Sequence, residues 1–466
     1  METKVNYKIA SLYYLIGNLF NKGFAFLTVP IFSRILSTED YGLVTTYNSW
    51  VSMLSLVLSC AIHMGIRMAF VDYKNKEHDF LSVCTFFNII VTAVTLVITL
   101  LVVSVINIDV NIQILVLCIM HSFATVVILN FTQYQMMKYK YKSRTFLLVM
   151  PSFLSIIVSL YFIIFVFDNN LYLGRIIPTA LIHLFFALVI IFLIFKQSRE
   201  LFNKEYLLYA LKISAPLIIH GIGLNILSQS DRVMITALVG AKQTGIYSLV
   251  YNFGMLAQVI TVTLEGIWVP WFISKLEKSD RDSIKKMSVL YMKLITCLII
   301  GIIIMGPEII KIFADSRYWG GIVIIPPIVL ASYMLFMYSM YVNVEHYYKD
   351  TVYITINTLI SAAINLILNF IFIPMYGYLA AAFSTLLAYI VSFFLHSHHA
   401  KKLEPDLYPL KLFALPFAQV LIMIIIFYVF NEQLLLRISA LAVYLCYMLL
   451  SNKTEIKEVL LNRKKI

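Results

Sequence analysis

Long apolar stretches alternate with short polar connections along almost the whole chain of 466 residues. Each stretch is close to the ~20 residues that an α-helix needs to cross the hydrocarbon core of a bilayer. The pattern predicts an all-α, polytopic membrane protein with about 14 transmembrane helices. The expected helices occupy residues 7–33, 41–66, 80–106, 111–137, 146–167, 172–195, 207–239, 243–270, 287–312, 320–345, 351–373, 377–399, 408–430 and 432–451.

Two pairs of glycines indicate an internal repeat. Gly42 and Gly245 each follow a hydrophobic segment, Gly174 and Gly377 each open a later one, and both pairs are 203 residues apart. Six helices fit in this distance, and an even number gives two parallel repeats, an arrangement common in transporters. The repeat predicts an N-terminal lobe at residues 1–200, a C-terminal lobe at 201–402, and two additional helices with a basic tail at 403–466.

Composition and charge placement support this topology. The chain is 61% hydrophobic and 13% charged, with a mean hydropathy of +0.88, whereas soluble domains carry about 25% charged residues. Of the 36 lysines and arginines, 27 fall on the termini and even-to-odd connections and 7 on the opposite ones. The positive-inside rule therefore places both termini in the cytoplasm. The net charge of +12 is explained by the membrane, and no nucleic-acid partner is expected.

Catalytic and metal-binding patterns are missing from the sequence. The five cysteines are widely spaced inside expected spans, which is typical of small apolar residues rather than ligands or disulfides. The sequence has no Walker A run, nucleotide-binding glycine fingerprint, H-E-x-x-H or G-x-S-x-G. We expect no cofactor, metal site or enzyme activity, and no cleavable signal peptide. Energy for transport then comes from an ion gradient, the membrane potential or metabolism.

The first expected helix carries a polar stripe that includes Asn18 and Asn21. Lys22 lies about midway through this span and has no acidic residue within helical reach. A charge near the bilayer centre costs ~2.5–3.5 kcal/mol on insertion scales. One interpretation is a cation that lines a central aqueous cavity. The other is a lysine whose long side chain extends to the membrane interface.

The seventh expected helix repeats this arrangement. Asn225, Gln229 and Arg232 fall at i, i+4 and i+7, on one helical face, and Asp231 precedes Arg232. The two charges can line the cavity or form an ordinary ion pair at the outer rim. Gly221 and Gly223 after Pro216 predict a bend or local unwinding in this helix.

Two further helices carry polar residues. The eleventh has an asparagine or serine every four residues, including Asn357 and Asn365, which suits hydrogen bonding between helices as well as a sugar-binding face. The eighth has Gln258 and Glu265. Glu265 can pair with Lys293 or take up a proton that is coupled to transport, and the sequence favours neither interpretation.

Three passages give the chain a family resemblance. They are residues 30–42 (PIFSRILSTEDYG), 230–248 (SDRVMITALVGAKQTGIYS) and 373–382 (IPMYGYLAAA). Their order and spacing resemble the multidrug/oligosaccharidyl-lipid/polysaccharide exporter superfamily, and especially its Wzx-type flippases. The third departs from the family pattern at Leu379, where a glycine is common. The resemblance covers nearly the whole chain and implies a MATE-like fold.

The resemblance implies a flippase of the bacterial cytoplasmic (inner) membrane. Its substrate would be an undecaprenyl-diphosphate-linked oligosaccharide repeat unit for O-antigen, capsule or another surface polysaccharide. Its partners would be this lipid-linked glycan, membrane lipids and the polysaccharide polymerase machinery. We expect the two lobes to alternate access to the two sides of the membrane.

A diphosphate that crosses hydrocarbon needs fixed cations in a hydrated cavity. Lys22 is the first candidate for this role and Arg232 the second, with Arg34 and Arg67 as rim candidates at opposite ends. The polar stripes would contact sugar hydroxyls, and Glu265 and Asp231 are the candidates for proton coupling.

Two other functions compete with this prediction. A cation-coupled multidrug efflux transporter of the same superfamily would use carboxylates such as Asp231 and Glu265 to bind cationic drugs. The first helix has no aspartate, which argues against it. A membrane-embedded glycan polymerase or transferase would need a large outer loop or a soluble catalytic domain, and the outer connections are short.

Overall fold

The computed structural model describes residue 13 and residues 28–106 and 111–451, and the regular elements among them are all helical. In chain order these elements are α2 (Thr38–Ser59), α3 (Ile62–Asp72), α4 (Glu77–Ile106), α5 (Ile112–Met137), α6 (Tyr141–Phe165), α7 (Leu171–Gln197), α8 (Lys204–Val239), α9 (Ala241–Glu277), α10 (Arg281–Phe313), the 3-10 helix η1 (Ser316–Ile324), α11 (Ile325–Tyr347), α12 (Thr351–Tyr376), α13 (Tyr378–Leu403), α14 (Lys411–Val429) and α15 (Leu434–Ser451).

The predicted fold class is confirmed. In the described part, eleven helical segments are long and apolar enough to cross a membrane, with η1 and α11 counted as one. Two bent pairs, α2 with α3 and the two parts of α8, bring the number to as many as thirteen. These segments match the second to fourteenth predicted spans. The first predicted span lies mostly outside the described residues, although residues 28–35 are helical.

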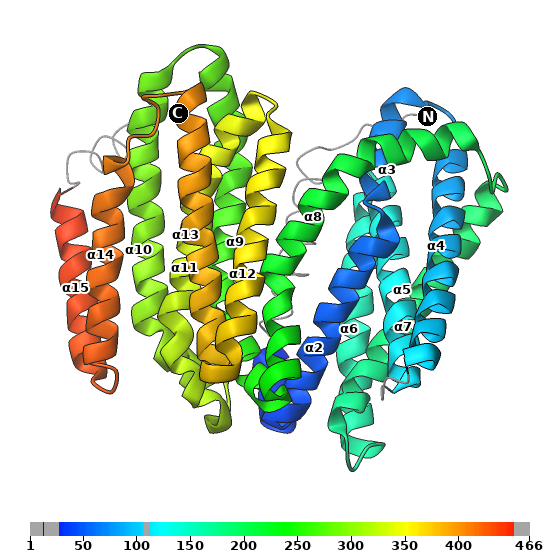
Figure 1. Cartoon of the computed structure of the whole chain (residues 1–466), viewed down its shortest axis with the longest axis horizontal. Helices are drawn as coiled ribbons and strands as arrows, with labels where there is room; N and C mark the ends of the chain where they lie inside the picture. The colour runs from blue at the N-terminus through cyan, green and yellow to red at the C-terminus, as the bar shows by residue number, and fades with distance from the viewer. Residues whose placement is uncertain (1–12, 14–27, 107–110, 452–466) are drawn as a thin grey trace. The chain divides into compact units, whose positions relative to one another are not determined.

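Contacts divide the chain into two compact units. Unit 1 comprises Met1–Ser248 with Thr358–Ala381, and unit 2 comprises Leu249–Asn357 with Ala382–Ile466. This division follows packing, whereas the predicted lobes at residues 1–200 and 201–402 follow the sequence repeat, and those boundaries stay a prediction. Figure 1 shows the helices of each unit in chain order by colour.

The core of unit 1 is formed where α3, α4, α5 and α7 meet. It contains Phe80, Ile119, Val127 and Ile190, all at most 2% exposed. The outer face of α4 is apolar instead, with Val105 81% exposed. An apolar outer surface is expected of a helix that faces lipid, because lipid tails are as apolar as the side chains.

Two helical breaks in unit 1 lie against each other. α2 and α3 meet at 41°, and Cys60 and Ala61 between them have left-handed backbone angles. The carbonyl group of Ala61 accepts a hydrogen bond from Ser214 Oγ at 3.0 Å, so the break has a side-chain partner from α8. α8 itself bends by 50° between Ala215 and Ile218, which confirms the bend predicted in this helix.

Gly42 and Gly245, one of the two glycine pairs that indicate the repeat, pack against each other. A Cβ atom on Gly42 would lie 1.8 Å from the carbonyl oxygen of Ala241, and one on Gly245 would lie 1.9 Å from that of Thr38. The starts of α2 and α9 therefore cross at a distance that only glycine permits.

A second pair of repeat-related contacts lies beside this crossing. Asp40 Oδ1 accepts from the backbone N–H of Tyr172 at the start of α7, and Gln243 Oε1 accepts from that of Tyr378 at the start of α13, each at 3.2 Å. Asp40 and Gln243 are 203 positions apart, so both repeats cap their sixth helix with the same position of their second helix.

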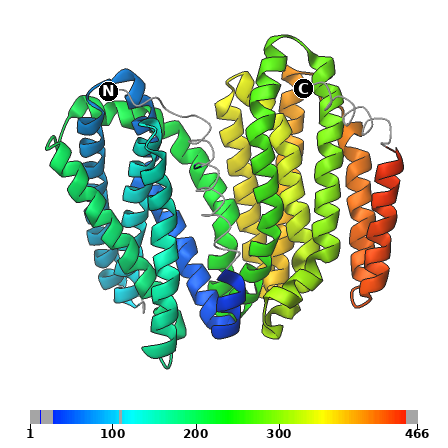
Figure 2. The same ribbon diagram turned by 180° about the vertical axis from the view of Figure 1, so that it is seen from behind.

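In unit 2, the helix α10 packs against α11, α14 and α15, and both views show α14 and α15 side by side (Figures 1 and 2). Arg437 of α15 is 1% exposed, pairs with Glu308 of α10, and donates to the carbonyl of Ile304 at 3.2 Å. A buried arginine needs such partners, so this contact fixes α15 onto α10.

Candidate functional site

A row of hydrogen bonds, here called the polar seam, joins α2 to α8 inside unit 1. The three bonds join Thr46 to Thr236 at 2.6 Å, Ser49 to Gln229 at 3.0 Å and Ser52 to Asn225 at 3.4 Å. The residue numbers rise along α2 as they fall along α8, so the helices are antiparallel here. Asn225 and Gln229, predicted to share one helical face, do so, and this face packs against α2.

Asp231 lies on another side of α8 and is 1% exposed. It accepts a hydrogen bond from the Tyr247 hydroxyl at 2.5 Å and one from Asn369 Nδ2 at 2.7 Å. Ser230 donates to Asn365 Oδ1 at 3.3 Å. These donors are what a buried carboxylate requires, because leaving it without hydrogen bonds is costly. The carboxylate therefore connects α8 to α9 and to the unit 1 part of α12.

Arg232 is 6% exposed and lies next to the polar seam. Its Nη1 donates to the carbonyl oxygen of Ser228 at 2.8 Å and to Gln229 Oε1 at 3.5 Å. Gln229 Oε1 also accepts a hydrogen bond from Ser49 of α2, so Gln229 links the guanidinium to α2. The structure thus brings together Asn225, Gln229 and Arg232 within one bundle of membrane-spanning helices.

The other predicted cations lie elsewhere. Arg34 is exposed, before the start of α2. Arg67 is half-buried in α3, with its Nη1 3.8 Å from Met64 Sδ, and none of the ion pairs in the described part involves it. Lys22, with Asn18 and Asn21, lies outside the described residues, so the role predicted for these three stays a prediction.

The eleventh-helix stripe corresponds to α12 and is buried. Asn365 is engaged with Ser230, and Asn357 in unit 2 lies 3.5 Å from His396 Nδ1. Both asparagines are at most 1% exposed. Hydrogen bonding between helices, one of the two predicted interpretations, is therefore present, and a sugar-binding face stays a prediction.

Unit 2 places Glu265 of α9 next to α11, where it accepts a hydrogen bond from the Ser339 hydroxyl. The sequence offered Lys293 as its partner and had no signal for Ser339, which lies 74 positions away. Glu265 is half-buried, and its role in proton coupling stays a prediction.

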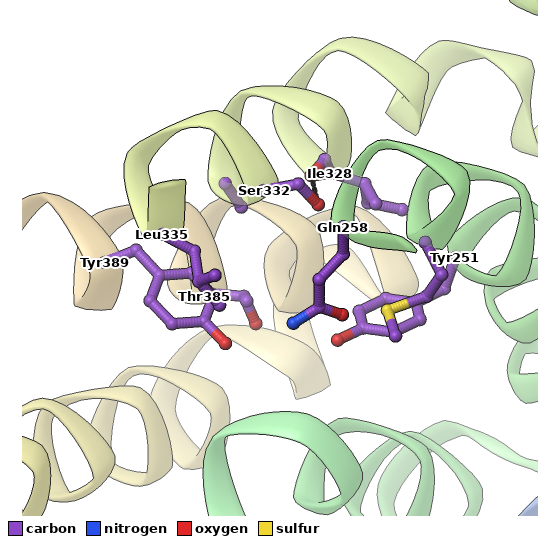
Figure 3. A pocket seen from close by; sticks show the side chains of 9 residues that line it. Tyr251, Gln258, Ile328, Ser332, Leu335, Thr385 and Tyr389 are labelled. Atoms are coloured by element: carbon purple, nitrogen blue, oxygen red, sulfur yellow. Dashed lines mark hydrogen bonds between the residues drawn. The ribbon is translucent and has the colours of Figure 1, made fainter. Parts of the chain in front are cut away.

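A small cavity lies between α9, α11 and α13 of unit 2, with room for about one water molecule. Figure 3 shows the Gln258 amide directed into it between Tyr251 and the Thr385–Tyr389 wall. Ser332 closes another side, with its hydroxyl donating to Ile328 O at 3.3 Å. Apolar side chains make up most of the lining, and its hydroxyl and amide groups carry no charge, so the cavity suits a neutral group.

The sequence did not predict one buried polar contact of unit 2. Glu345 of α11 and His396 of α13 form a buried pair at 2.7 Å. They are 51 positions apart, and no short motif links them. Among the described residues, no group of three or more histidine, cysteine or carboxylate side chains is arranged to hold a metal ion.

Comparison with known proteins adds a sequence family. The profile of the family described as polysaccharide biosynthesis protein matches residues 10–276. A curated protein of the Lsg locus of Haemophilus influenzae is 23% identical over 277 residues. The match covers 58% of this chain and 66% of that relative, just under two thirds of its length.

Solved structures share the fold. The Lipid II flippase MurJ, in an inward closed conformation, has a TM-score of 0.68 at 16% identity, over 96% of this chain and 99% of that one. An inward-facing multidrug resistance MATE family transporter of the MOP superfamily has a TM-score of 0.59 at 13% identity, over 85% of this chain and 99% of that one. At these identities the likeness is one of fold.

Proposed function

This chain belongs to the polysaccharide biosynthesis protein family, and from that premise we propose that it moves a lipid-linked glycan across the bacterial inner membrane. The substrate is an undecaprenyl-diphosphate oligosaccharide, the repeat unit of an O-antigen, capsule or other surface polysaccharide. The family match over residues 10–276 carries the proposal. The likeness of the fold to a structure named as a lipid flippase supports it.

The diphosphate is the difficult part of this substrate. Its negative charges must enter a region where unpaired charge is costly, and fixed cations reduce that cost. Arg232 suits this role because its guanidinium is buried among helices and bonded through Nη1 to a carbonyl and an amide oxygen. Lys22 is the other cation proposed for this role, and Arg34 and Arg67 are proposed to attract the diphosphate at the two rims.

The sugars need hydroxyl and amide partners rather than charge. The polar seam supplies these through Gln229 and Asn225, which are both half-buried. Asn18 and Asn21 of the first predicted helix are proposed as further partners of the sugar hydroxyls. The polyprenyl tail stays in the bilayer, so the cavity has to accept only the head group.

Movement of the head group requires that the bundle open alternately to the two sides. The breaks between α2 and α3 and within α8 are suitable bending points, since the helix axis already turns there by 41° and 50°. Proton binding at Glu265 or Asp231 would couple this movement to an ion gradient. Both termini are cytoplasmic, and polymerase machinery receives the glycan on the outer side.

The proposal is tested by lipid analysis of cells that lack the protein. We expect polyprenyl-diphosphate oligosaccharides to accumulate on the cytoplasmic leaflet and the wild-type chain to clear them. Lys22→Ala and Arg232→Ala should clear them more slowly. Arg317→Ala is the matched control, because Arg317 is exposed in η1 and pairs with Asp315.

The competing function, multidrug efflux, predicts a different result from the same cells. They would accumulate no glycan lipid and would become sensitive to cationic dyes, and that outcome would overturn the flippase proposal. If wild type and both variants clear the glycan lipid equally fast, the flippase proposal stands, but Lys22 and Arg232 do not contribute to its substrate site.

A further inference from the structure

The buried pair of Glu345 and His396 has no role in the proposed function. The pair lies near one end of unit 2: Glu345 is two residues before the end of α11, and His396 is seven before the end of α13. Glu345 is 0% and His396 1% exposed. His396 Nδ1 lies 2.7 Å from Glu345 Oε2, and the Asn357 amide lies 3.5 Å from the same nitrogen.

The number of protons on this pair decides its charge. A neutral imidazole beside a carboxylate has a net charge of −1. One added proton makes the pair neutral, either as imidazolium with carboxylate or as imidazole with carboxylic acid. A net charge with no water contact is strongly disfavoured, and a neutral pair is much less so. The surroundings therefore favour the pair with the proton bound.

The second carboxylate oxygen strengthens this argument. Glu345 Oε1 is buried and has no hydrogen-bond partner in the described part of the chain. A full negative charge on the carboxylate would leave this atom unsatisfied at a cost of ~1–3 kcal/mol or more.

A second histidine–carboxylate pair lies between the buried pair and the end of the helices. His399 Nε2 lies 2.7 Å from Asp350 Oδ2, and the His399 ring stacks on Tyr353 at 3.5 Å. His399 is one helical turn after His396, and its side chain is 13% exposed while that of Asp350 is 36% exposed. This outer pair is therefore the more exposed of the two.

Aromatic rings continue from the buried pair towards the small cavity. Tyr338 of α11 stacks on His396 with ring centroids 5.3 Å apart, and on Tyr389 at 6.1 Å. Tyr389 lines the cavity that holds the Gln258 amide (Figure 3). Titratable and polar side chains therefore follow one another from the outer pair to the cavity.

We propose that Glu345 and His396 form a proton-binding site that exchanges one proton with water through His399 and Asp350. The binding step moves one proton from water onto the pair, and no other bond changes. Two further titratable groups lie near the pair: Tyr338, whose ring stacks on His396 with centroids 5.3 Å apart, and His346, which follows Glu345 in α11. Only the coupling of this proton to transport rests on the proposed function.

Loss of the proton would loosen this end of unit 2. The pair holds α11 to α13, and Asn357 joins α12 to it. A net negative charge in this place would draw in water or separate the helices, because either change restores solvation. Proton exchange is thus a means of changing the packing of three helices.

The test uses the purified full-length chain in detergent, without substrate. Histidine protonation is measured by nuclear magnetic resonance with labelled histidine, and His396→Gln assigns the His396 signal. Protonated carboxyl groups are measured by infrared difference spectroscopy, and Glu345→Gln assigns that of Glu345. Size-exclusion profiles and unfolding temperatures show that each variant is folded.

We expect the pair to lose one proton when the pH is raised, seen as a change in the His396 signal or in that of the Glu345 carboxyl group. Glu345→Gln should abolish this change, since the carboxylate that shares the proton is gone. His398→Gln is the control, because His398 is exposed on the same helix, and it should leave the titration unchanged. A pair whose two groups keep the same protonation throughout would overturn the proposal.

A second measurement asks whether the proton matters for transport. Translocation of a polyprenyl-diphosphate oligosaccharide into liposomes should depend on pH in the wild type and lose that dependence in His396→Gln. If the wild type translocates nothing, the proposed function is wrong, and the titration alone still tests whether Glu345 and His396 bind and release a proton. If His396→Gln translocates with the wild-type pH dependence, the coupling is excluded.

Discussion

Asp231 shows at the scale of one residue how this protein places a carboxylate inside the membrane. Its two donors, Tyr247 and Asn369, come from α9 and α12, so the carboxylate joins three helices at one point. A cation-binding role in drug efflux would require these donors to be displaced first. The observed contacts therefore favour a positioning role for Asp231 in unit 1.

Removing one of these donors tests that role. Tyr247→Phe deletes the hydroxyl that donates to Asp231 and leaves a buried carboxylate oxygen with fewer partners. We expect a loss of ~1–3 kcal/mol in the free energy of unfolding. The measurement is the thermal or denaturant midpoint in detergent, with Tyr161→Phe as control because Tyr161 is 56% exposed. Equal midpoints for the two variants would contradict it.

A pH dependence follows from Glu404, which lies just after α13. Arg281 donates to both its oxygens, at 2.7 and 2.8 Å, and the Tyr348 hydroxyl donates at 2.7 Å. The hydrogen bonds from Arg281, foremost, lower the pKa of Glu404 below its usual value. A lowered pKa means stability that is present above the unfolded value of about 4.3 and is lost as the pH falls through the folded one.

The unfolding temperature of the wild type should therefore fall when the solution is acidified below about pH 4. Glu404→Gln should be less stable at neutral pH and show a smaller acid-induced decrease, because the group that titrates is gone. Glu432→Gln, at an exposed position, should behave like the wild type. The same acid response in Glu404→Gln and in the wild type would exclude Glu404 as its source.

Individual residues could be predicted where the signal is local. Helical spacing alone grouped Asn225, Gln229 and Arg232 on α8, and the structure brings them together. Spacing within one helix does not identify partners on other helices. The hydrogen bonds of Gln229 with Ser49 and of Glu345 with His396 could therefore not be predicted. These pairs are 180 and 51 positions apart and follow from packing.

At the scale of the helices, the close crossing of α2 and α9 requires glycine at position 42. Gly42→Ala would place a methyl group 1.8 Å from a backbone oxygen, which neither helix can avoid without moving. We expect destabilisation at or above the upper end of the ~1–3 kcal/mol typical of overpacking, and a loss of folded protein. Expression level and the unfolding midpoint measure it.

Gly266→Ala is the matched control for that variant. A Cβ atom on Gly266 of α9 would meet no heavy atom within 4 Å, and alanine favours helix by about 1 kcal/mol over glycine. This variant should be as stable as the wild type or more so. If both alanine variants fold equally well, the close crossing of α2 and α9 does not exist in the folded protein.

Helix positions were predictable because each span is a long apolar run with polar ends. The break at Cys60 and Ala61 was not, since the predicted helix at residues 41–66 contains no proline or glycine at that point. The break depends on partners from elsewhere. Asn88 donates to the carbonyl of Leu58 at 2.8 Å and Ser214 to that of Ala61.

On the scale of the whole molecule, the 203-residue repeat could be recognised from its glycines, because only glycine fits at the crossing of α2 and α9. Asp40 and Gln243 differ in charge, yet they cap equivalent helices with the same geometry. Charge placement predicts the orientation, with 27 basic residues on the termini and even-to-odd connections and 7 on the opposite connections. Substrate identity has no such repeated signature, so it rests on the family.

The most direct test of lipid-linked glycan translocation uses the purified full-length chain in liposomes. A labelled polyprenyl-diphosphate oligosaccharide is placed in both leaflets, and an added glycosidase that cannot cross the membrane digests what reaches the outer one. With the protein present, the glycan in the inner leaflet should become fully digestible, and more slowly with Arg232→Ala than with Arg317→Ala. Digestion that stops at the outer-leaflet share, as in liposomes without protein, would contradict the proposed function.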